Sequence, residues 1–374
     1  MIEKTLLRIA IGLLAWQSMG RAANLEMNSA RGEQLFSSLS CIECHSVNGK
    51  GGKIGPDLGR RAGRHFTPAG LASTMWNHAP TMWAAMQARG VRAASLDEQG
   101  AADLFAWFYS VRYFERPGDA GRGKALLASK HCTDCHGLTD TKLAAAKPVA
   151  QWEATDQPMA LVDAMWNHAA AMRQEFAKRK LAWPDLNGQE FTDILVYVRG
   201  IAAARASSGQ FELGSSERGR ALFMSKGCEA CHAGKRAPGL LAPGETLTDA
   251  AAAMWNHAPR MGPLAPSLDP GEMLDVATFI WAQPFFTDSG NPAAGKRVFA
   301  SKGCKMCHEE GSNGAAKLTA GPAVLTSASK VSALWQHGPQ MLEQMKNQKI
   351  PWPRFDGMQM SNLIAYLNAR KSGN

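Results

Sequence analysis

The sequence contains no run of about 20 apolar residues, the length that a membrane-spanning helix needs. Cysteine is absent outside one recurring five-residue pattern, so no ninth cysteine exists to act as a separate thiolate ligand. Charged residues make up only 20% of the chain and hydrophobic residues 45%, a balance typical of a folded protein rather than of a disordered one. With 374 residues, we expect several domains and no transmembrane helix in the mature chain.

The N-terminus has the features of an export signal. Lys4 and Arg8 flank a short apolar run over residues 9–16, and residues 20–22 place small side chains at both positions that a signal peptidase reads. Because the run is too short to span a bilayer, we expect cleavage after Ala22 and a periplasmic protein. The alternative is that the segment is kept as a membrane anchor. Cleavage removes three basic residues and one acidic residue, so the formal charge falls from +9 to +7.

The pattern C-x-x-C-H occurs four times and contains all eight cysteines. Nine residues before the first cysteine of each copy lies a glycine, and four residues after that glycine comes Phe or Leu. This spacing predicts a short helix with the two residues on one face, where the glycine lets another helix approach closely. The glycines are Gly32, Gly123, Gly219 and Gly295, and the apolar residues are Phe36, Leu127, Phe223 and Phe299.

A second element follows each C-x-x-C-H copy. It reads M-W-N-H in the first three copies and L-W-Q-H in the fourth, with a methionine four residues after the histidine. We interpret its tryptophan as aromatic packing against a porphyrin. Each copy then ends in an apolar pattern of period 3.6 that contains aromatic residues and predicts a closing helix. The predicted closing helices span residues 102–113, 191–201, 273–283 and 360–369.

These repeats predict an all-α fold of four tandem small helical domains. Short breaks rich in Pro, Gly or Ser separate a closing helix from the next opening one. A unit this small has little apolar core of its own, and a buried prosthetic group would supply much of what is missing. The predicted segments are a signal peptide over 1–22 and domains over 23–116, 117–208, 209–289 and 290–374.

C-x-x-C-H is the attachment signature of c-type haem. Each thiol can form a thioether with a vinyl group of the porphyrin, and the adjacent histidine becomes the proximal iron ligand. Zinc would not need that histidine in every copy, a redox dithiol needs a strand–helix context, and structural disulfides need no histidine at all. We therefore expect four covalent haem c groups. The predicted attachment residues are Cys41, Cys44, Cys132, Cys135, Cys228, Cys231, Cys304 and Cys307, and the proximal ligands are His45, His136, His232 and His308.

Taken together, the elements resemble the class I cytochrome c family over nearly the whole mature chain. The shared features are the opening helix with Gly and Phe, C-x-x-C-H, a proline-containing loop, a distal methionine region and an aromatic closing helix. In that family the first and last helices cross at right angles with glycine against an aromatic ring. The resemblance implies such contacts for Gly32 with Trp107 and for Gly219 with Trp281.

The family also has a loop proline whose neighbourhood hydrogen-bonds the proximal histidine. Pro56 and Pro322 match it, and Pro148 and Pro243 match it less closely. Such a hydrogen bond would orient the imidazole and tune its basicity.

Each copy offers two candidates for the distal iron ligand, because a histidine and a methionine four residues apart share one helix face. The family pattern Asn-Gly-x-x-x-Met lines up with the methionine in the first three copies. It favours Met82, Met172, Met261 and Met341 as distal ligands. The alternative set is His78, His168, His257 and His337, in which case the methionines fill the core. A proline two residues after the histidine predicts that the histidine ends one helical segment in three copies, at Pro80, Pro259 and Pro339.

Two ligands on every iron would leave no open position for a substrate. We therefore expect an electron-transfer protein, without catalytic residues, whose partners are other redox proteins of the periplasm or of a membrane respiratory chain. The alternative is a subunit of a multihaem oxidoreductase with one catalytic haem. The third copy has the shortest connection after its motif, so His232 marks the haem most expected to differ. Nucleic-acid binding is not expected of an exported haem protein.

Overall fold

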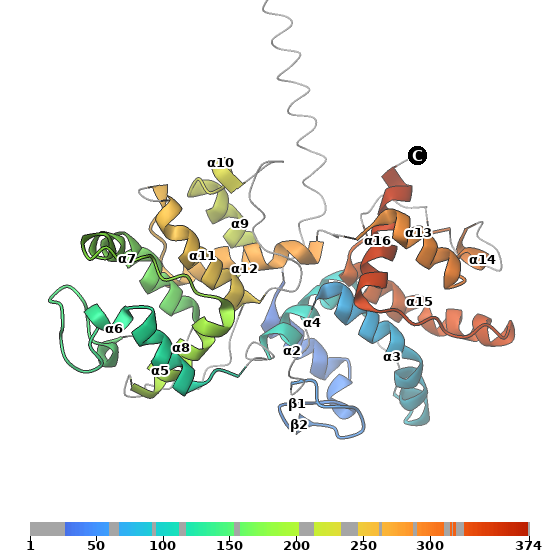
Figure 1. Ribbon diagram of the computed structural model, residues 1–374. Coiled ribbons are helices and arrows are strands. Elements are labelled where there is room, and N and C mark those ends of the chain that lie inside the picture. Colours follow the sequence, from blue (N-terminus) through green and yellow to red (C-terminus); the bar gives the residue numbers. More distant parts are fainter. Residues whose placement is uncertain are drawn as a thin grey trace, which may run out of the picture. The chain divides into compact units, whose positions relative to one another are not determined.

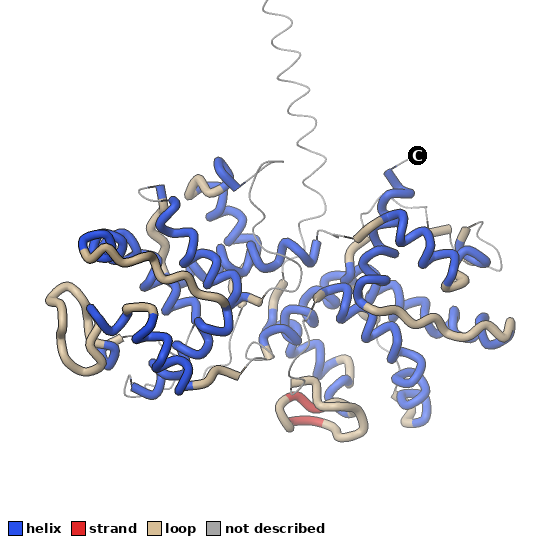
Figure 2. Tube along the Cα trace, in the orientation of Figure 1, coloured by secondary structure: helices blue, strands red, loops and turns tan. Residues whose placement is uncertain are grey.

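Helices form almost all of the regular structure in the computed structural model (Figure 2). The all-α fold predicted from the sequence is therefore confirmed, and no helix in the part of the chain that is described is long and apolar enough to cross a membrane. The predicted signal peptide lies outside that part. The described residues are 27–59, 67–91, 95–111, 117–152, 158–201, 213–232, 246–261, 264–286, 290–309, 315, 317–318 and 325–372.

Residue contacts divide the chain into two compact units (Figure 1). The first unit contains residues 1–27, 67–102 and 284–374, and the second contains residues 28–66 and 103–283. Each unit combines helices from more than one C-x-x-C-H copy. The four predicted domain boundaries stay a prediction.

The same four helical elements recur around each C-x-x-C-H copy, and we call each set a repeat (Figure 1). The opening helices are α2 (Ser29–Ser38), α5 (Ala120–Ser129), α9 (Ser216–Ser225) and α13 (Pro292–Ser301). The motif segments are η1 (Cys41–Glu43), α6 (Cys132–Cys135), α10 (Glu229–His232) and α14 (Lys305–His308). The helices with the tryptophan and histidine, here the distal helices, are α3 (Pro68–Ala88), α7 (Pro158–Lys178), α11 (Leu247–Met261) and α15 (Ser327–Asn347). The closing helices are α4 (Glu98–Ser110), α8 (Gly188–Ile201), α12 (Pro270–Phe286) and α16 (Gly357–Ser372).

Two smaller elements interrupt this order. In the first repeat, β1 (Ser46–Val47) and β2 (Lys50–Gly51) pair antiparallel, and in the second repeat a 3-10 turn, η2 (Val149–Gln151), precedes the distal helix.

The residue before the first cysteine of every motif has a left-handed backbone. This conformation ends the opening helix and starts the turn of helix that contains the cysteines. Glycine adopts it without strain in the third and fourth repeats, whereas the first two repeats use serine and histidine. The φ angles are 59° at Ser40, 64° at His131, 79° at Gly227 and 78° at Gly303.

Opening and closing helices cross at the predicted glycines. A Cβ atom added to Gly32 would collide with the backbone carbonyl of Asp103 and with the side chain of Trp107, so no larger residue fits there. The predicted contact between Gly32 and Trp107 is confirmed. The same collision occurs in the other repeats, with the aromatic partners Tyr197 at Gly123, Phe279 at Gly219 and Tyr366 at Gly295.

The predicted pairing of Gly219 with Trp281 is wrong. Phe279 lies four residues after the carbonyl of Asp275 that faces the glycine, so it occupies the next turn on the same face of α12. Trp281 lies on another face and packs against Tyr109 at a centroid distance of 4.0 Å.

An ion pair that the sequence analysis did not single out joins opening and closing helices in the first three repeats. In the second repeat, Nε of Arg122 donates to Oδ2 of Asp193 at 2.7 Å, and Oδ1 of Asp193 accepts from the backbone N–H of Asp119 at 2.7 Å. The Asp193 side chain is only 3% exposed. The equivalent pairs are Arg31 with Asp103 and Arg218 with Asp275. In the fourth repeat Asn362 replaces the aspartate and Ala294 the arginine.

The distal helices continue through their prolines, so the prediction that the histidine ends a helical segment is wrong. Pro80 cannot donate to the carbonyl of Trp76, four residues earlier. That carbonyl accepts instead from the indole N–H of Trp352 at 3.0 Å. A side chain from the fourth repeat thus replaces the hydrogen bond that proline removes from the first.

In the second unit, the distal helices α7 and α11 pack against each other. The indole N–H of Trp166 on α7 donates to the carbonyl of Pro266 in the third repeat at 2.8 Å. The next residue, Asn167, donates to the carbonyl of Leu268 at 2.7 Å and accepts from its N–H at 3.2 Å. The second repeat therefore holds the segment that leads into α12 of the third.

Side chains of the third repeat make the same contacts with the backbone of the second. Trp255 on α11 donates to the carbonyl of Pro184 at 2.8 Å, and Asn256 exchanges two hydrogen bonds of 2.8 Å with the backbone of Leu186. Trp255 also packs on Trp183 at a centroid distance of 4.2 Å. The tryptophan and asparagine of M-W-N-H therefore join two repeats, a role that packing against a porphyrin did not predict.

The distal helices α3 and α15 form the corresponding pair in the first unit. Asn77 donates to the carbonyl of Phe355 at 2.6 Å and accepts from its N–H at 2.9 Å. In the opposite direction, Gln336 of the fourth repeat donates to the carbonyl of Leu96 in the first repeat at 3.3 Å. The hydroxyl of Ser332 donates to the same carbonyl at 2.9 Å. Repeats therefore pair as second with third and as first with fourth.

Candidate haem-binding sites

Backbone carbonyls orient the proximal histidines of the first two repeats. Nδ1 of His45 lies 3.0 Å from the carbonyl oxygen of Pro56, and Nδ1 of His136 lies 2.9 Å from that of Lys147. Both acceptors come eleven residues after the histidine. A proton on Nδ1 leaves the lone pair of Nε2 for a metal. The predicted role of Pro56 is confirmed, and in the second repeat the acceptor is the residue directly before Pro148.

Asp57 fixes the loop that carries Pro56. Its carboxylate accepts from the hydroxyl of Ser46 at 2.8 Å and from the backbone N–H of Gly49 at 2.7 Å. Burial raises the pKa of Asp57, but these hydrogen bonds and two further backbone N–H groups outweigh burial and bring the pKa below its ordinary value. The charged carboxylate thereby ties the β1–β2 hairpin to the carbonyl that orients His45.

The first cysteine of each motif lies in surroundings that disfavour a thiolate. Burial raises the pKa of the thiol in every repeat, to about 11 at Cys41 and Cys132 and upward from its ordinary value at Cys228 and Cys304. A redox-active dithiol needs the opposite shift. None of the eight cysteines is in a disulfide. The thiols therefore fit an apolar attachment site better than a redox dithiol.

In the second repeat, the distal helix brings His168 to the proximal His136. The two ring centroids are 6.4 Å apart and the ring planes meet at 68°. Two imidazoles on opposite sides of one metal have centroids roughly 6 Å apart, because each nitrogen lies about 2 Å from the metal. Burial lowers the pKa of His168 and the charge of His136 lowers it further, which favours the neutral form that binds metal. Met172, the other candidate, is one turn further along α7.

The third repeat has the same arrangement. The ring centroids of His232 and His257 are 5.5 Å apart, with an interplanar angle of 73°. Burial lowers the pKa of His232, and His257 lowers it further. Nδ1 of His232 is buried without a hydrogen-bond partner among the residues that the structure describes. Pro243, eleven residues further on, lies outside them.

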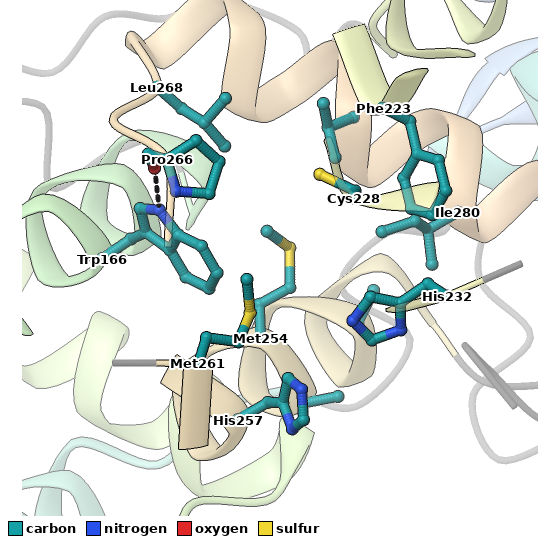
Figure 3. A pocket seen from close by; sticks show the side chains of 13 residues that line it. Trp166, Phe223, Cys228, His232, Met254, His257, Met261, Pro266, Leu268 and Ile280 are labelled. Carbon is teal, nitrogen blue, oxygen red and sulfur yellow. Dashed lines mark hydrogen bonds between the residues drawn. The ribbon is translucent and has the colours of Figure 1, made fainter. Parts of the chain in front are cut away.

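A pocket surrounds this third histidine pair (Figure 3). Its empty space, open solvent included, is about 850 Å³, and most of its lining is apolar. The predicted attachment residue Cys228 and both distal candidates, His257 and Met261, line the pocket together with His232. Trp166 lines it too, although it belongs to the second repeat. The pocket therefore contains every type of side chain that a covalent haem requires.

Several buried donors also fit a group with carboxylate acceptors. Within the described residues, the indole N–H groups of Trp83, Trp107 and Trp183 are buried and have no partner. A buried donor without an acceptor is costly to leave unpaired. The two propionates of a haem are acceptors of the required kind. The thiols and the paired imidazoles together fit haem c.

In the first repeat, the candidate iron ligands are divided between the two units, whereas in the fourth repeat they all belong to one unit. His45 belongs to the second unit, whereas His78 and Met82 belong to the first. Met82 packs against a core cluster that contains Trp83 and Leu334. The choice between histidine and methionine in these repeats stays a prediction. The fourth-repeat candidates, all in the first unit, are His308, His337 and Met341.

Two regions of the chain, residues 29–111 and 292–371, match the Cytochrome c family. They correspond to the first and fourth repeats. No curated protein and no solved structure matches the chain. The two matches support a multi-domain c-type cytochrome. Cytochrome c domains imply covalent haem c, haem-based electron transfer and redox proteins as partners.

Proposed function

We propose that the chain is an exported tetrahaem cytochrome c that carries electrons between redox proteins of the periplasm or of a membrane respiratory chain. One observation carries the proposal. The second and third repeats lie outside the two family matches, yet they have the same C-x-x-C-H motif, the same helix crossing at glycine and a distal histidine beside the proximal one. All four repeats thus share the motif and the helix crossing, and the second and third add a pair of neighbouring histidines.

The cysteines and proximal histidines predicted from the sequence have the roles of attachment and ligation in this proposal. When bound, haem c supplies a one-electron iron centre. The chain itself holds His45 and His136 through backbone carbonyls, and it partly buries the first cysteine of each motif. These residues orient the ligands and limit the access of water, and both effects set the potential of a metal centre.

For the second and third repeats, we propose His168 and His257 as distal ligands rather than Met172 and Met261. The centroid distances of 6.4 and 5.5 Å to the proximal rings support this choice. Two imidazoles give a lower potential than a histidine with a methionine. With Met82 and Met341 as the distal ligands of the other two repeats, the second and third repeats would form the low-potential part of the chain. Distal ligation by Met82 or His78 and by Met341 or His337 stays a prediction.

The test is the number of haems on the full-length chain, expressed with its N-terminal segment in a bacterium that attaches haem c in the periplasm. Intact-mass spectrometry should give four haems per chain. Replacing both cysteines of one motif by alanine should remove one haem and leave three, for each motif in turn. The matched control replaces Ser37 and Ser38, next to the first motif, and should keep four. Fewer than four haems on the wild-type chain contradicts the proposal.

The same preparation tests transfer against catalysis. Ligation of every iron by two side chains predicts an entirely low-spin spectrum at neutral pH. A high-spin fraction that binds cyanide would instead support one catalytic haem and contradict a pure carrier.

A further inference from the structure

Trp166 has a position that its own repeat does not explain. It lies on α7 of the second repeat, yet it lines the pocket that contains Cys228 and His232 of the third (Figure 3). Its side chain is only 8% exposed. The second repeat therefore supplies one wall of the candidate site of the third.

Hydrogen bonds hold Trp166 in that wall. The indole N–H donates to the carbonyl of Pro266 at 2.8 Å, and Pro266 itself lines the same pocket (Figure 3). The neighbouring Asn167 binds both backbone groups of Leu268, another lining residue. Three contacts thus fix the ring relative to the third repeat, and rotating it away would break the bond to Pro266.

We propose that Trp166 is a positioning residue of the third haem site, contributed by the second repeat, and that it raises the reduction potential of that haem by keeping water out. The proposal rests on the proposed function. It makes the second and third repeats one redox unit, because the potential of one site depends on a side chain of the other.

The physical reason is the charge of the iron. The oxidised centre carries one more positive charge than the reduced one, and water stabilises the more charged form. A large buried ring in the wall of the pocket that contains His232 and Cys228 excludes water and so favours the reduced form. A smaller side chain at position 166 opens the wall, admits water and lowers the potential.

Trp166→Ala and Trp166→Phe in the full-length holoprotein test this inference by spectroelectrochemical titration. The third haem is identified as the component that disappears when Cys228 and Cys231 are both replaced by alanine. For Trp166→Ala, we expect the ratio of reduced to oxidised third haem at a fixed potential to fall about tenfold, which for one electron is 59 mV. Trp166→Phe keeps an apolar ring and should give a smaller shift in the same direction.

Two matched controls separate the wall from the joint between repeats. Asn167→Ala breaks the bonds to Leu268 but leaves the ring of Trp166 and its bond to Pro266, so the third haem should shift less than in Trp166→Ala. Trp76→Ala removes the equivalent bond in the first unit, where Trp76 donates to the carbonyl of Pro353 at 2.8 Å. It should leave the third haem unchanged.

The outcomes are distinct from those of the proposed function. Four haems with an unchanged third potential in Trp166→Ala overturn this inference and leave the proposed function standing. A shift confined to the haem at Cys132 and Cys135 overturns it as well, because Trp166 would then serve its own repeat. A chain without covalent haem overturns the proposed function itself.

Discussion

The two pairs of distal helices are joined by the same kind of side-chain hydrogen bond, but the pair in the first unit makes fewer of them. In the second unit, Asn167 and Asn256 each make two hydrogen bonds to the backbone of the opposite repeat. In the first unit, Asn77 does the same, but the return contact is a single bond of 3.3 Å from Gln336. The difference follows from one substitution, because the fourth repeat reads L-W-Q-H. It teaches that the asparagine of M-W-N-H serves the joint between repeats.

A second difference separates the fourth repeat from the others. Its opening and closing helices cross at glycine as elsewhere, but Asn362 stands where the other repeats have a buried aspartate paired with arginine. The crossing is therefore common to all repeats, and the ion pair is an addition in three of them.

The largest expected loss of stability concerns the helix crossing at glycine, which both units have. Gly123→Ala in the second unit and Gly295→Ala in the first should each destabilise the protein by about 3 kcal/mol, because the added Cβ meets a backbone carbonyl that cannot move aside. Denaturant unfolding of the holoprotein measures both. Gly200→Ala is the control, since nothing lies within 4 Å of its Cβ position, and it should be neutral or gain up to about 1 kcal/mol. A crossing that accepts alanine in one unit would break the equivalence.

The next prediction compares the hydrogen bonds that join the repeats in the second unit with those in the first unit. Asn167→Ala removes both bonds to Leu268 and should destabilise the protein by about 2 kcal/mol. Gln336→Ala removes one long bond to Leu96, which Ser332 still contacts, and should lose about 0.5 kcal/mol. Equal losses in denaturant unfolding would mean that the substitution in the fourth repeat has no structural consequence.

The ion pair predicts a difference in acid sensitivity. Burial raises the pKa of Asp193, but hydrogen bonds from Arg122, the N–H of Asp119 and Gln189 outweigh it and lower the pKa below its ordinary value. A lowered pKa in the folded state adds stability that is fully present above the unfolded pKa of about 4 and is lost as the pH falls from there through the lower folded pKa. Asp193→Asn should therefore lower the melting temperature by a few degrees at pH 7 and by less at pH 3.

The reverse change in the fourth repeat sharpens this prediction. Asn362→Asp places a carboxylate opposite Ala294, without an arginine, and should lower the melting temperature more at pH 7 than at pH 3. Both variants should therefore lose more at pH 7 than at pH 3, one because a paired charge is removed and the other because an unpaired charge is added. An unchanged melting temperature at pH 7 in Asn362→Asp would show that a carboxylate at this crossing does not need the arginine.

The smallest effect concerns two equivalent tryptophans. Trp352 donates to the carbonyl of Trp76 that Pro80 leaves without its helical donor, so Trp352→Phe should lose about 1 kcal/mol. The indole N–H of Trp183 has no partner in the described part of the second unit, so Trp183→Phe should change the stability of haem-free chain very little. Thermal unfolding compares the pair, and an equal loss in both would contradict the difference between the units.

The local features of the site could be predicted from the sequence, because each depends on spacing along the chain. The glycines, the motif histidines and the acceptor near Pro56 lie within one repeat, and periodicity or family resemblance places them. The pairing of repeats could not follow, since hydrogen bonds such as that from Trp166 to Pro266 span about 100 residues. The sequence does carry a signal for the ion pairs: in the first three repeats, arginine directly precedes the glycine and aspartate precedes the aromatic partner by four residues.

The prediction that the distal helices break at their prolines was wrong for a related reason. Proline propensity is local, and it predicted a break at Pro80 because the carbonyl of Trp76 loses its donor. The donor that compensates, Trp352, comes from another repeat. Only the fold brings that side chain within reach.

Near-infrared magnetic circular dichroism of the fully oxidised wild-type protein, beside His168→Met and His257→Met, tests the central claim most directly. Charge-transfer bands of haem iron distinguish two imidazole ligands from histidine with methionine. Ligation by His168 and His257 predicts a bis-histidine band in the wild type that loses one haem equivalent in each variant. A wild-type spectrum with histidine–methionine bands alone, unchanged by either substitution, would contradict the account and return the distal role to the methionines.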